Sequence, residues 1–507
     1  MNKTFLDRAI EIISPRIALN RYKNRSKLGL FNDVLSDVRN HQRKYDAAGK
    51  SRHHADWLTI NLSPNQEVNA ALTWLRDRSR DLGRNNPYAR RVFRLMPNNV
   101  VGSGIIPTPT NIRAAQIKSL KIAWKDWAEK LGCDYDQNYN FYGLQWLIVR
   151  TVAESGECLI RKVKAGSSYK VPLRLQVLEG DYIDTTHHSG QWTSENNGLQ
   201  YIDYYGIRFN KKGERIGYWI WDQHPSEFPT QSSIVSADDI IHVYEVERPG
   251  QIRGIPIMAS VMLRLRDLDD YEFTERIRNK IAACFTVFIQ DDSVDNAGET
   301  VAPFETEKIE PGAIERLPPG KTISVAQPPS KDGFSEYVKG NLRGIAAGVG
   351  ASYENLTGDY SNVNFSSGRM GWLEFAREVE QWQWRIIIPK FCDRAYEWFA
   401  EAAQFAGYIP FNISWQVSWT APRREMIDPL KELQAIKLQL RTGLISWQDV
   451  VKQFGYIPDE LKEELKMDAA MWDELELKPE GDPRFDTNRP PDAILGEDPA
   501  NSADSGN

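Results

Sequence analysis

Residues 358–371 read GDYSNVNFSSGRMG and lie between two stretches that both have helical patterns. Glycine permits backbone angles that other residues avoid, and Ser, Asn and Asp side chains form hydrogen bonds with their own backbone. This composition predicts a flexible or turning loop that interrupts the longest helical region of the chain. Because such a segment cannot build a core, we expect it to be exposed to solvent or to a partner.

Helical patterns cover residues 334–349 before this segment and residues 372–406 after it. In the second stretch apolar residues recur at helical spacing from Trp372 to Phe405, which indicates one long helix. Pro389 lies inside it, and proline in a helix interior removes a hydrogen bond and bends the helix. We therefore predict a kinked rod.

A further long helix is predicted over residues 257–281, and its later half is crowded with charge. It is too polar all round for a core helix or a membrane span. Opposite charges such as those of Glu275 and Arg278 support a solvent-facing helix, or they pair with copies of the chain in a ring. Residues 282–333 are strand-like and then rich in Pro and Gly, which suggests a small projecting lobe.

The first half of the chain reads as an α+β body. Helical patterns cover residues 72–84 and 112–131, and a β pattern runs through residues 157–247 with a hairpin turn at 211–213. In the last part, a strand-like stretch at 411–419 precedes helices whose starts and ends carry capping residues.

Capping residues mark the bounds of the C-terminal helices. Asp428 caps a helix with Pro429 at its first position, and Gly443 ends that helix. Residues 478–507 are rich in Pro, Asp, Asn, Gly and Ser and are predicted to be disordered. Residues 1–44 suit an arm that lies on a neighbour.

Composition excludes several classes of protein. The 507 residues carry a net charge of −6 with a pI near 5.8, so no global positive field exists to hold DNA tightly and specifically. Four widely spaced cysteines argue against a zinc ribbon or a disulfide framework and fit a reducing cytoplasm. Neither a signal peptide nor a membrane anchor is expected, and the protein is predicted to be soluble and intracellular when made.

Two fragments imitate a phosphate-binding loop, GKS at 49–51 and GKT at 320–322. That loop needs an earlier glycine so that backbone N–H groups wrap the phosphates, but Lys44 and Glu315 occupy those positions. A nucleotide site is therefore not predicted. The adjacent histidine pairs lack metal-ligand spacing, and no two acids can be assigned as acid and base, so we predict no metal, no cofactor and no catalytic residue. GIAAGVGAS at 344–352 favours close packing of small residues, for instance between subunits.

Six phrases in order resemble the portal proteins of tailed bacteriophages, of the lambda type: KYDAAG (44–49), RDRSRDLGRNNPYARR (76–91), NNVVGSGI (98–105), ERPGQIRGIP (247–256), LTGDYSNVNFSSGR (356–369) and IDPLKELQA (427–435). The resemblance covers the chain from about Tyr45 to the C-terminal helices. It implies a homo-oligomeric ring, typically of twelve subunits, at one vertex of the virion capsid. Through this ring the terminase would drive double-stranded DNA inward, and adaptor, head-completion and major capsid proteins would contact it, with assembly in the host cytoplasm and no membrane partner.

The resemblance also implies a portal-type fold with named parts: a wing (45–253, with 407–423 returning to it), two stem helices (254–281 and 334–350), a small α/β clip (282–333), a tunnel loop (351–371), a long kinked helix (372–406) and a helical crown (424–477). The loop would line the narrowest part of the channel. Net acidity would let DNA slide, because a wall rich in Lys and Arg holds phosphates.

Two sets of candidate site residues are implied by the resemblance. The tunnel loop and stem would present to DNA Lys339, Arg343, Tyr360, Asn362, Asn364, Ser366, Ser367 and Arg369. Clip residues that would dock partners are Glu305, Glu307, Glu310 and Glu315. For the three basic residues, pairing with Asp359 or with a neighbour's stem acids is the alternative, and for the four glutamates it is a solvated acidic face.

Two other functions compete with this interpretation. A nucleic-acid-processing ATPase or nuclease of the packaging machinery would need a complete phosphate loop and clustered metal-binding carboxylates. A capsid or tape component would not explain two helices that flank a proline-rich lobe.

Overall fold

The computed structural model describes residues 61–166, 169–194, 200–227, 231–283, 287–290, 314–317, 333–411, 413, 415–422, 426, 428–477 and 484. The chain divides into two compact units, Met1–Ser63 and Pro64–Asn507, and the described helices and strands belong to the second. The predicted arm and nearly all of the predicted tail therefore lie outside the described residues.

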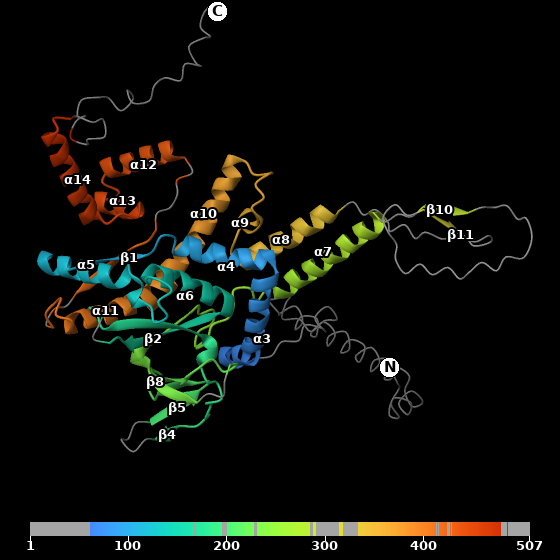
Figure 1. The fold of residues 1–507 in the computed structure, drawn as a ribbon, viewed down its shortest axis with the longest axis horizontal. Helices are drawn as coiled ribbons and strands as arrows, with labels where there is room; N and C mark the ends of the chain where they lie inside the picture. Colours follow the sequence, from blue (N-terminus) through green and yellow to red (C-terminus); the bar gives the residue numbers. More distant parts are fainter. Residues whose placement is uncertain are drawn as a thin grey trace, which may run out of the picture. The chain divides into compact units, whose positions relative to one another are not determined.

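Helices and strands alternate along this unit (Figure 1), which confirms the mixed α and β class. The helices are α3 (Pro64–Asn85), α4 (Pro87–Val100), α5 (Ala114–Ala128), α6 (Phe141–Ser155), α7 (Met262–Ala283), α8 (Phe334–Gly348), α9 (Tyr353–Thr357), α10 (Phe365–Gln381), the π-helix η6 (Trp382–Cys392), α11 (Asp393–Phe405), α12 (Pro429–Arg441), α13 (Trp447–Gln453) and α14 (Pro458–Glu474). Short 3-10 turns are η3 (Leu131–Cys133), η4 (Gly180–Tyr182) and η5 (Ala237–Asp239). Among these helices, none has a stretch apolar and long enough to span a membrane.

The strands form four sheets, built from β1 (Ile106–Thr110), β2 (Glu157–Lys164), β3 (Leu173–Glu179), β4 (Thr193–Ser194), β5 (Gln200–Tyr204), β6 (Ile207–Asn210), β7 (Arg215–Trp221), β8 (Ser232–Ser236), β9 (Ile240–Tyr244), β10 (Val287–Gln290), β11 (Ile314–Leu317) and β12 (Gln416–Thr420). The sheet orders are β3-β2-β9, β4-β5-β6-β7-β8, β1-β12 and β10-β11, and only the last pair is parallel. The predicted β region is confirmed, and the predicted turn joins β6 to β7, with Gly213 at φ +81°. β12 returns to pair with β1, so the chain after the long helix rejoins the first half.

The main core lies where α5, α6 and α11 meet, and it is rich in aromatic rings. Trp124 meets Phe141 edge-on at a centroid distance of 4.8 Å and meets Phe399 at 4.9 Å. Trp127 packs on Phe399 at 5.2 Å, and all four side chains are buried. Aromatic pairs of this kind add to the stabilisation from burial. The stripe of the predicted helix 112–131 therefore packs against the long helix near the other end of the sequence.

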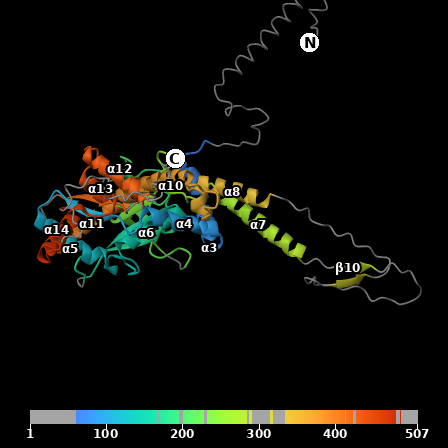
Figure 2. The same cartoon turned by 90° about the horizontal axis from the view of Figure 1, so that it is seen from above.

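α7 and α8 lie side by side as a helical hairpin (Figures 1 and 2). Two glycines of α8 lie at this contact: a Cβ on Gly344 would lie 1.7 Å from Nη1 of the long Arg264 side chain of α7, and one on Gly348 would lie 2.4 Å from Cγ1 of Val261, just before α7. Gly344 and Gly348 of the stretch 344–352 thus pack within the chain. α7 begins later than predicted, because residues 257–261 form turns before Met262.

The predicted loop at 351–371 is shorter in the structure. α9 takes up residues 353–357 and α10 starts at Phe365, so only residues 351–352 and 358–364 of this span are non-helical. The long helix over 372–406 is confirmed, and the disturbance expected at Pro389 takes the form of a π-helix. A π-helix shifts the hydrogen bonds by one residue, which accommodates a position that has no N–H to donate.

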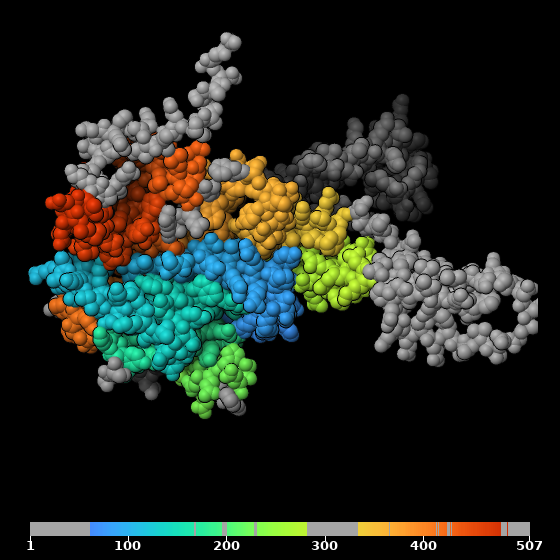
Figure 3. Space-filling model, turned by 45° about the horizontal axis from the view of Figure 1, so that its top comes forward, coloured from blue at the N-terminus to red at the C-terminus, as the bar shows by residue number. Residues whose placement is uncertain are grey.

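The C-terminal helices begin and end where the capping residues predict. Asp428 accepts a hydrogen bond from the Lys431 backbone N–H at 3.3 Å, and Gly443 adopts φ +73° after α12. Lys121 of α5 pairs with Glu460 of α14 at 3.0 Å, and Figure 3 shows these helices, in red and orange, beside α5 in cyan.

Candidate functional site

The exposed loop from Gly358 to Asn364 is held from within by one carboxylate. Asp359 accepts hydrogen bonds from the Ser361 hydroxyl at 2.6 Å and from the Tyr353 hydroxyl at 3.2 Å. Hydrogen bonds from Ser361 lower the pKa of Asp359 most, and those from Tyr353 and the charge of Lys339 lower it further. The loop is therefore a built turn with Tyr360 59% exposed at its tip.

Two of the predicted polar groups in the loop are already engaged. The Asn364 side chain accepts from the Ser367 N–H at 2.8 Å, and the Ser367 hydroxyl accepts from the Asn364 N–H at 3.2 Å. This reciprocal capping box fixes the first turn of α10. Asn362 and Ser366 are exposed, as is Tyr360, so these three uncharged side chains of the predicted set lie at the surface.

The three predicted basic residues do not form one cluster in the chain. Lys339 of α8 is half-buried and acts on Asp359. Arg343 is exposed with its guanidinium 5.8 Å from the centre of the Tyr353 ring. Arg369 of α10 is exposed.

The charge of Arg369 acts on Asp428, the residue that caps α12. Hydrogen bonds that Lys431 donates to Asp428 are the main cause of the lowered pKa of this carboxyl, and the charge of Arg369 adds to it. Within the chain, Lys339 therefore acts on Asp359 of the loop, whereas Arg369 acts on Asp428, the cap of α12.

A buried ionic cluster joins the hairpin to the rest of the unit, and Glu157 is its centre. Glu157, fully buried at the start of β2, accepts from Nε of Arg253 at 2.8 Å, from Nη2 of Arg253 at 2.5 Å and from the Gly254 backbone N–H at 3.0 Å. Arg76 of α3 donates to the same carboxylate and, through Nε, to the Ser155 carbonyl at 3.1 Å. α3, β2 and the segment that leads into α7 therefore meet on one side chain.

Charge pairing keeps this carboxylate ionised. Burial alone would raise the pKa of Glu157, but Arg253 and Arg76, with a hydrogen bond from His242, outweigh it and hold the pKa well below its usual range. His242 is kept neutral instead. Its pKa falls to about 4 because desolvation and the nearby arginines outweigh the attraction of Glu157.

The contacts of His242 explain why it stays neutral. Its Nε2 lies 3.1 Å from Oε2 of Glu157, and its Nδ1 lies 3.5 Å from Nη1 of Arg215. Nε2 must donate to a carboxylate, so Nδ1 must accept from the guanidinium. A second ring proton, on Nδ1, would point at the Arg215 guanidinium, so protonation of His242 is unfavourable.

We expect the stability of the protein to fall as the pH drops from 6.5 to 4, partly through His242. Its folded pKa is lowered from 6.5 to about 4, so in this window the unfolded state gains a proton that the folded state does not. The loss attributable to this residue is about 3 kcal/mol. Guanidinium unfolding at both pH values should show a smaller loss for His242→Gln than for the wild type. His188→Gln, on an exposed ring, is the control, and equal losses in all three proteins would contradict the assignment.

One group of side chains has the composition of a metal site. In the described ranges Glu179, Asp181 and His224 bring ligand atoms within 4.8 Å of one another. Nη2 of Arg80 already donates to Glu179 at 2.9 Å and to Asp181 at 2.5 Å. The two carboxylates thus have a protein cation between them.

A Ser, His and Asp trio near β8 does not have the arrangement of a nucleophile and its base. The Ser232 hydroxyl donates to Asp184 at 2.6 Å, and His187 Nε2 lies 3.3 Å from Ser232 and 3.4 Å from Asp184. In catalytic triads the nucleophile and the acid lie at opposite ring nitrogens. His187 instead stacks on Trp219 at 3.7 Å.

Of the four predicted clip glutamates, one belongs to a described strand. Glu305, Glu307 and Glu310, and both phosphate-loop fragments, lie outside the described residues. Glu315 belongs to β11, where its backbone pairs with that of Phe288 in β10. The role predicted for these glutamates stays a prediction.

Sequence reasoning missed Glu157 and His242. The one available signal was an acid directly after Gly156 and before the apolar run CLI, a position where an uncompensated charge would be buried. Its partners, Arg76 and Arg253, lie within two of the quoted phrases, but nothing in the sequence pairs them with Glu157.

Comparisons with known proteins give a consistent result. The family model described as "Phage portal protein, lambda family" matches residues 50–383. A "Probable portal protein" of Halomonas phage phiHAP-1 is 26% identical over 431 residues, which cover 79% of this chain and 81% of the relative. "Portal protein B" of Escherichia phage lambda is 23% identical over 450 residues, which cover 76% and 82%.

A solved structure, "Neck of native GTA particle computed with C12 symmetry", contains a chain that superposes on 75% of this chain and 94% of its own length. The TM-score is 0.41, with 15% sequence identity. That degree of likeness is too low to carry a conclusion about the fold.

Proposed function

The chain belongs to the lambda family of phage portal proteins, and we propose that it forms a ring at one capsid vertex through which viral DNA is packaged and later ejected. The family match over residues 50–383 carries this proposal. The ring would be a structural conduit without catalytic activity of its own. Twelve subunits are the expected number, and terminase, adaptor and head-completion proteins and the major capsid protein are the expected partners in the virion.

The parts of the described unit fit the roles proposed for them. The α7–α8 hairpin would be the stem, and the body with β12 returning to β1 would be the wing. The loop at 358–364 would be the tunnel loop, the rod of α10, η6 and α11 would link it to the crown, and α12 to α14 would form the crown. The lobe that holds β10 and β11 would be the clip.

The chemistry of the loop supports DNA passage over DNA binding. Between Gly358 and Asn364 the sequence carries one charge, that of Asp359, and it is negative. Phosphates would meet the exposed Tyr360 and Asn362, which lack the charge that releases counterions and makes binding tight. The buried Glu157 cluster would keep the stem fixed to the wing while DNA moves.

Imaging of the purified full chain by negative-stain microscopy tests the conduit, together with an ATP hydrolysis assay. The proposal requires rings with a central hole and no hydrolysis above the buffer control. A monomer with no bore under capsid-assembly conditions would overturn it. ATP hydrolysis that stays with the chain through successive purification steps would favour the alternative function, an ATPase of the packaging machinery.

Arg369 is the basic residue that we expect to contact DNA most directly, because it is exposed and follows the loop. Arg369→Ala should reduce the DNA retained in filled heads, and it should weaken the salt dependence of retention, since a phosphate contact is lost in every subunit. Arg377→Ala removes an exposed charge two turns later on α10 and serves as the control. Unchanged packaging and retention in Arg369→Ala would leave pairing with Asp428 as the role of this residue.

A further inference from the structure

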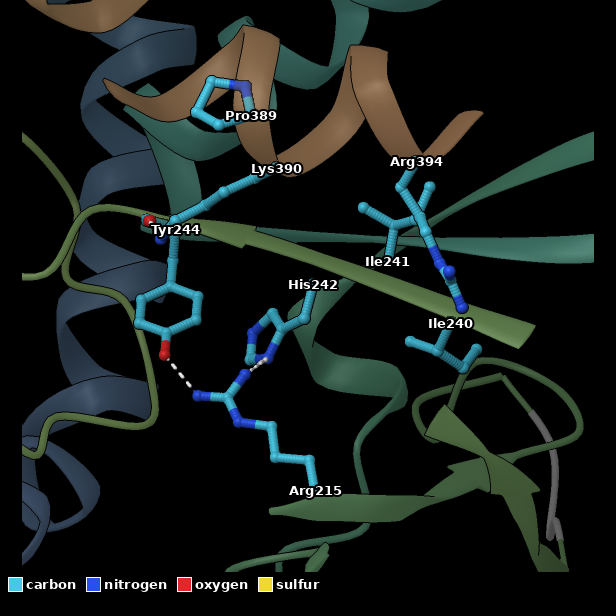
Figure 4. Close-up of a pocket in the computed structure, with 8 residues that line it drawn as sticks. All are labelled: Arg215, Ile240, Ile241, His242, Tyr244, Pro389, Lys390 and Arg394. Carbon is cyan, nitrogen blue, oxygen red and sulfur yellow. Dashed lines mark hydrogen bonds between the residues drawn. The ribbon is translucent and has the colours of Figure 1, made fainter. Parts of the chain in front are cut away.

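An open pocket with a volume of about 370 Å³ lies between β9 and the π-helix. Figure 4 shows the Arg215 side chain reaching it from β7, while Lys390 and Arg394 descend from the helix on the opposite side. The remaining lining residues are Ile240, Ile241, His242, Tyr244 and Pro389. Three permanent or titratable cations thus line one hollow, and none of its lining residues is an acid.

Two of these cations have only neutral groups as hydrogen-bond partners. Arg215 donates to the Tyr244 hydroxyl, to the Tyr218 hydroxyl at 3.3 Å and to Nδ1 of His242 at 3.5 Å. Lys390 donates to the Tyr244 carbonyl at 2.5 Å and lies 4.3 Å from the centre of the Tyr244 ring. Within the ranges that the structure describes, neither forms an ion pair with a carboxylate.

Arg394 differs, because it has acids of its own. It pairs with Glu397 at 2.9 Å and with Asp238 at 3.4 Å. Its charge is therefore compensated, while Arg215 and Lys390 form no ion pair within the described residues. Two half-buried cations that share a hollow repel each other and lose hydration, so the arrangement is unfavourable unless an anion is added.

Titration behaviour agrees with this geometry. The pKa of Lys390 falls to about 8, first because of burial and then because of the charge of Arg215, against which Glu245 acts only partly. An anion between the two cations would reverse that shift. His242 stays neutral in this pH range, so it adds no charge of its own.

We infer that this pocket binds an oxyanion, a phosphate or a carboxylate, through Arg215 and Lys390. Arg215 offers a planar fork of donors that matches either group, and Lys390 adds a point charge. The apolar side chains of Ile240 and Ile241 line the wall beside them. The anion has two possible sources, free or esterified phosphate in solution and an acidic side chain of a second copy of the chain.

Calorimetric titration of the purified full chain with inorganic phosphate at constant ionic strength tests this site. Binding should be saturable and at least about tenfold weaker in Lys390→Gln, the loss of one charge-assisted bond. Arg385→Gln removes an exposed charge from the same helix outside the pocket and should bind as the wild type does. Arg215→Lys keeps the positive charge but loses the planar set of donors, so it should weaken phosphate binding without abolishing it. Because this change is conservative, it also serves as a second test if another variant fails to fold.

The source of the anion is separated by comparing the unassembled and assembled chain. Phosphate binding to both forms supports a solution phosphate. Binding to the unassembled chain alone, together with weaker assembly of Lys390→Gln, supports a carboxylate from a second copy. No saturable binding to either form, or equal losses in Lys390→Gln and Arg385→Gln, would overturn the site.

The pH dependence gives an independent readout with sulfate, whose charge does not change between pH 7 and 9. Lys390 faces Arg215 from β7, Tyr244 and His242 from β9, Glu245 beyond β9 and Arg394 from its own helix. Because its pKa is about 8, it is charged at the lower pH and largely neutral at the higher one. Affinity for sulfate should fall across this interval in the wild type and stay flat in Lys390→Gln, and a parallel fall in both would contradict the role of Lys390.

Discussion

Glu157→Ala should lower the free energy of unfolding by about 3–5 kcal/mol, the range seen when one partner of a buried ion pair is removed. The substitution leaves Arg76 and Arg253 buried at 4% and 2% exposure with their shared acceptor gone. It also removes the acceptor of the Gly254 N–H. Guanidinium unfolding followed by tryptophan fluorescence measures the change, and imaging shows whether rings still form.

Two other variants separate the buried charge from ion pairing in general. Glu179→Ala breaks a pair with Arg80 in which the glutamate side chain is 47% exposed, and it should cost about 0–1 kcal/mol. Glu157→Gln keeps the volume of the side chain and loses only the charge, so its effect should lie between the two. If Glu157→Ala and Glu179→Ala are equally stable, the cluster does not hold the segment before α7 in place.

Local sequence signals predicted the elements of this fold well. Capping residues located the start of α12, and helical periodicity found α5, with its buried tryptophans, and the long helix around Pro389. These signals depend on neighbours within a few positions, so they are visible in the sequence. The loop was predicted too long, because Asn364 and Ser367 were counted as loop formers and in fact cap α10.

The sites that depend on long-range contacts were not predictable in the same way. Arg215 and Lys390 belong to a hairpin and a helix far apart in the sequence, and only the packing of β9 against the π-helix brings them into one pocket. Glu157 reads locally as an unusual start to an apolar strand. Its role depends on Arg253, which follows it by 96 residues in the sequence and donates to its carboxylate.

Gly254→Ala should destabilise the protein by more than about 3 kcal/mol, beyond the usual range for an overpacked core position. A Cβ at this position would lie 2.0 Å from the carbonyl oxygen of Gly156 and 2.7 Å from Cβ of Tyr244. The first contact is with backbone, which cannot rotate away as a long side chain can. Thermal unfolding should report the loss, and ring imaging should show whether the hairpin still assembles.

Gly250→Ala in the same phrase is the matched control. Gly250 adopts φ +84°, a conformation that disfavours alanine, but a Cβ there would meet open space. Its cost should be about 1 kcal/mol, the backbone strain alone. The difference between the two variants therefore isolates the contact between Gly254 and Gly156. That contact places the α6 C-terminus directly against the segment that carries Arg253 to Glu157. Equal effects of the two substitutions would mean that this segment has room to shift. The Glu157 cluster would then not fix the position of α7.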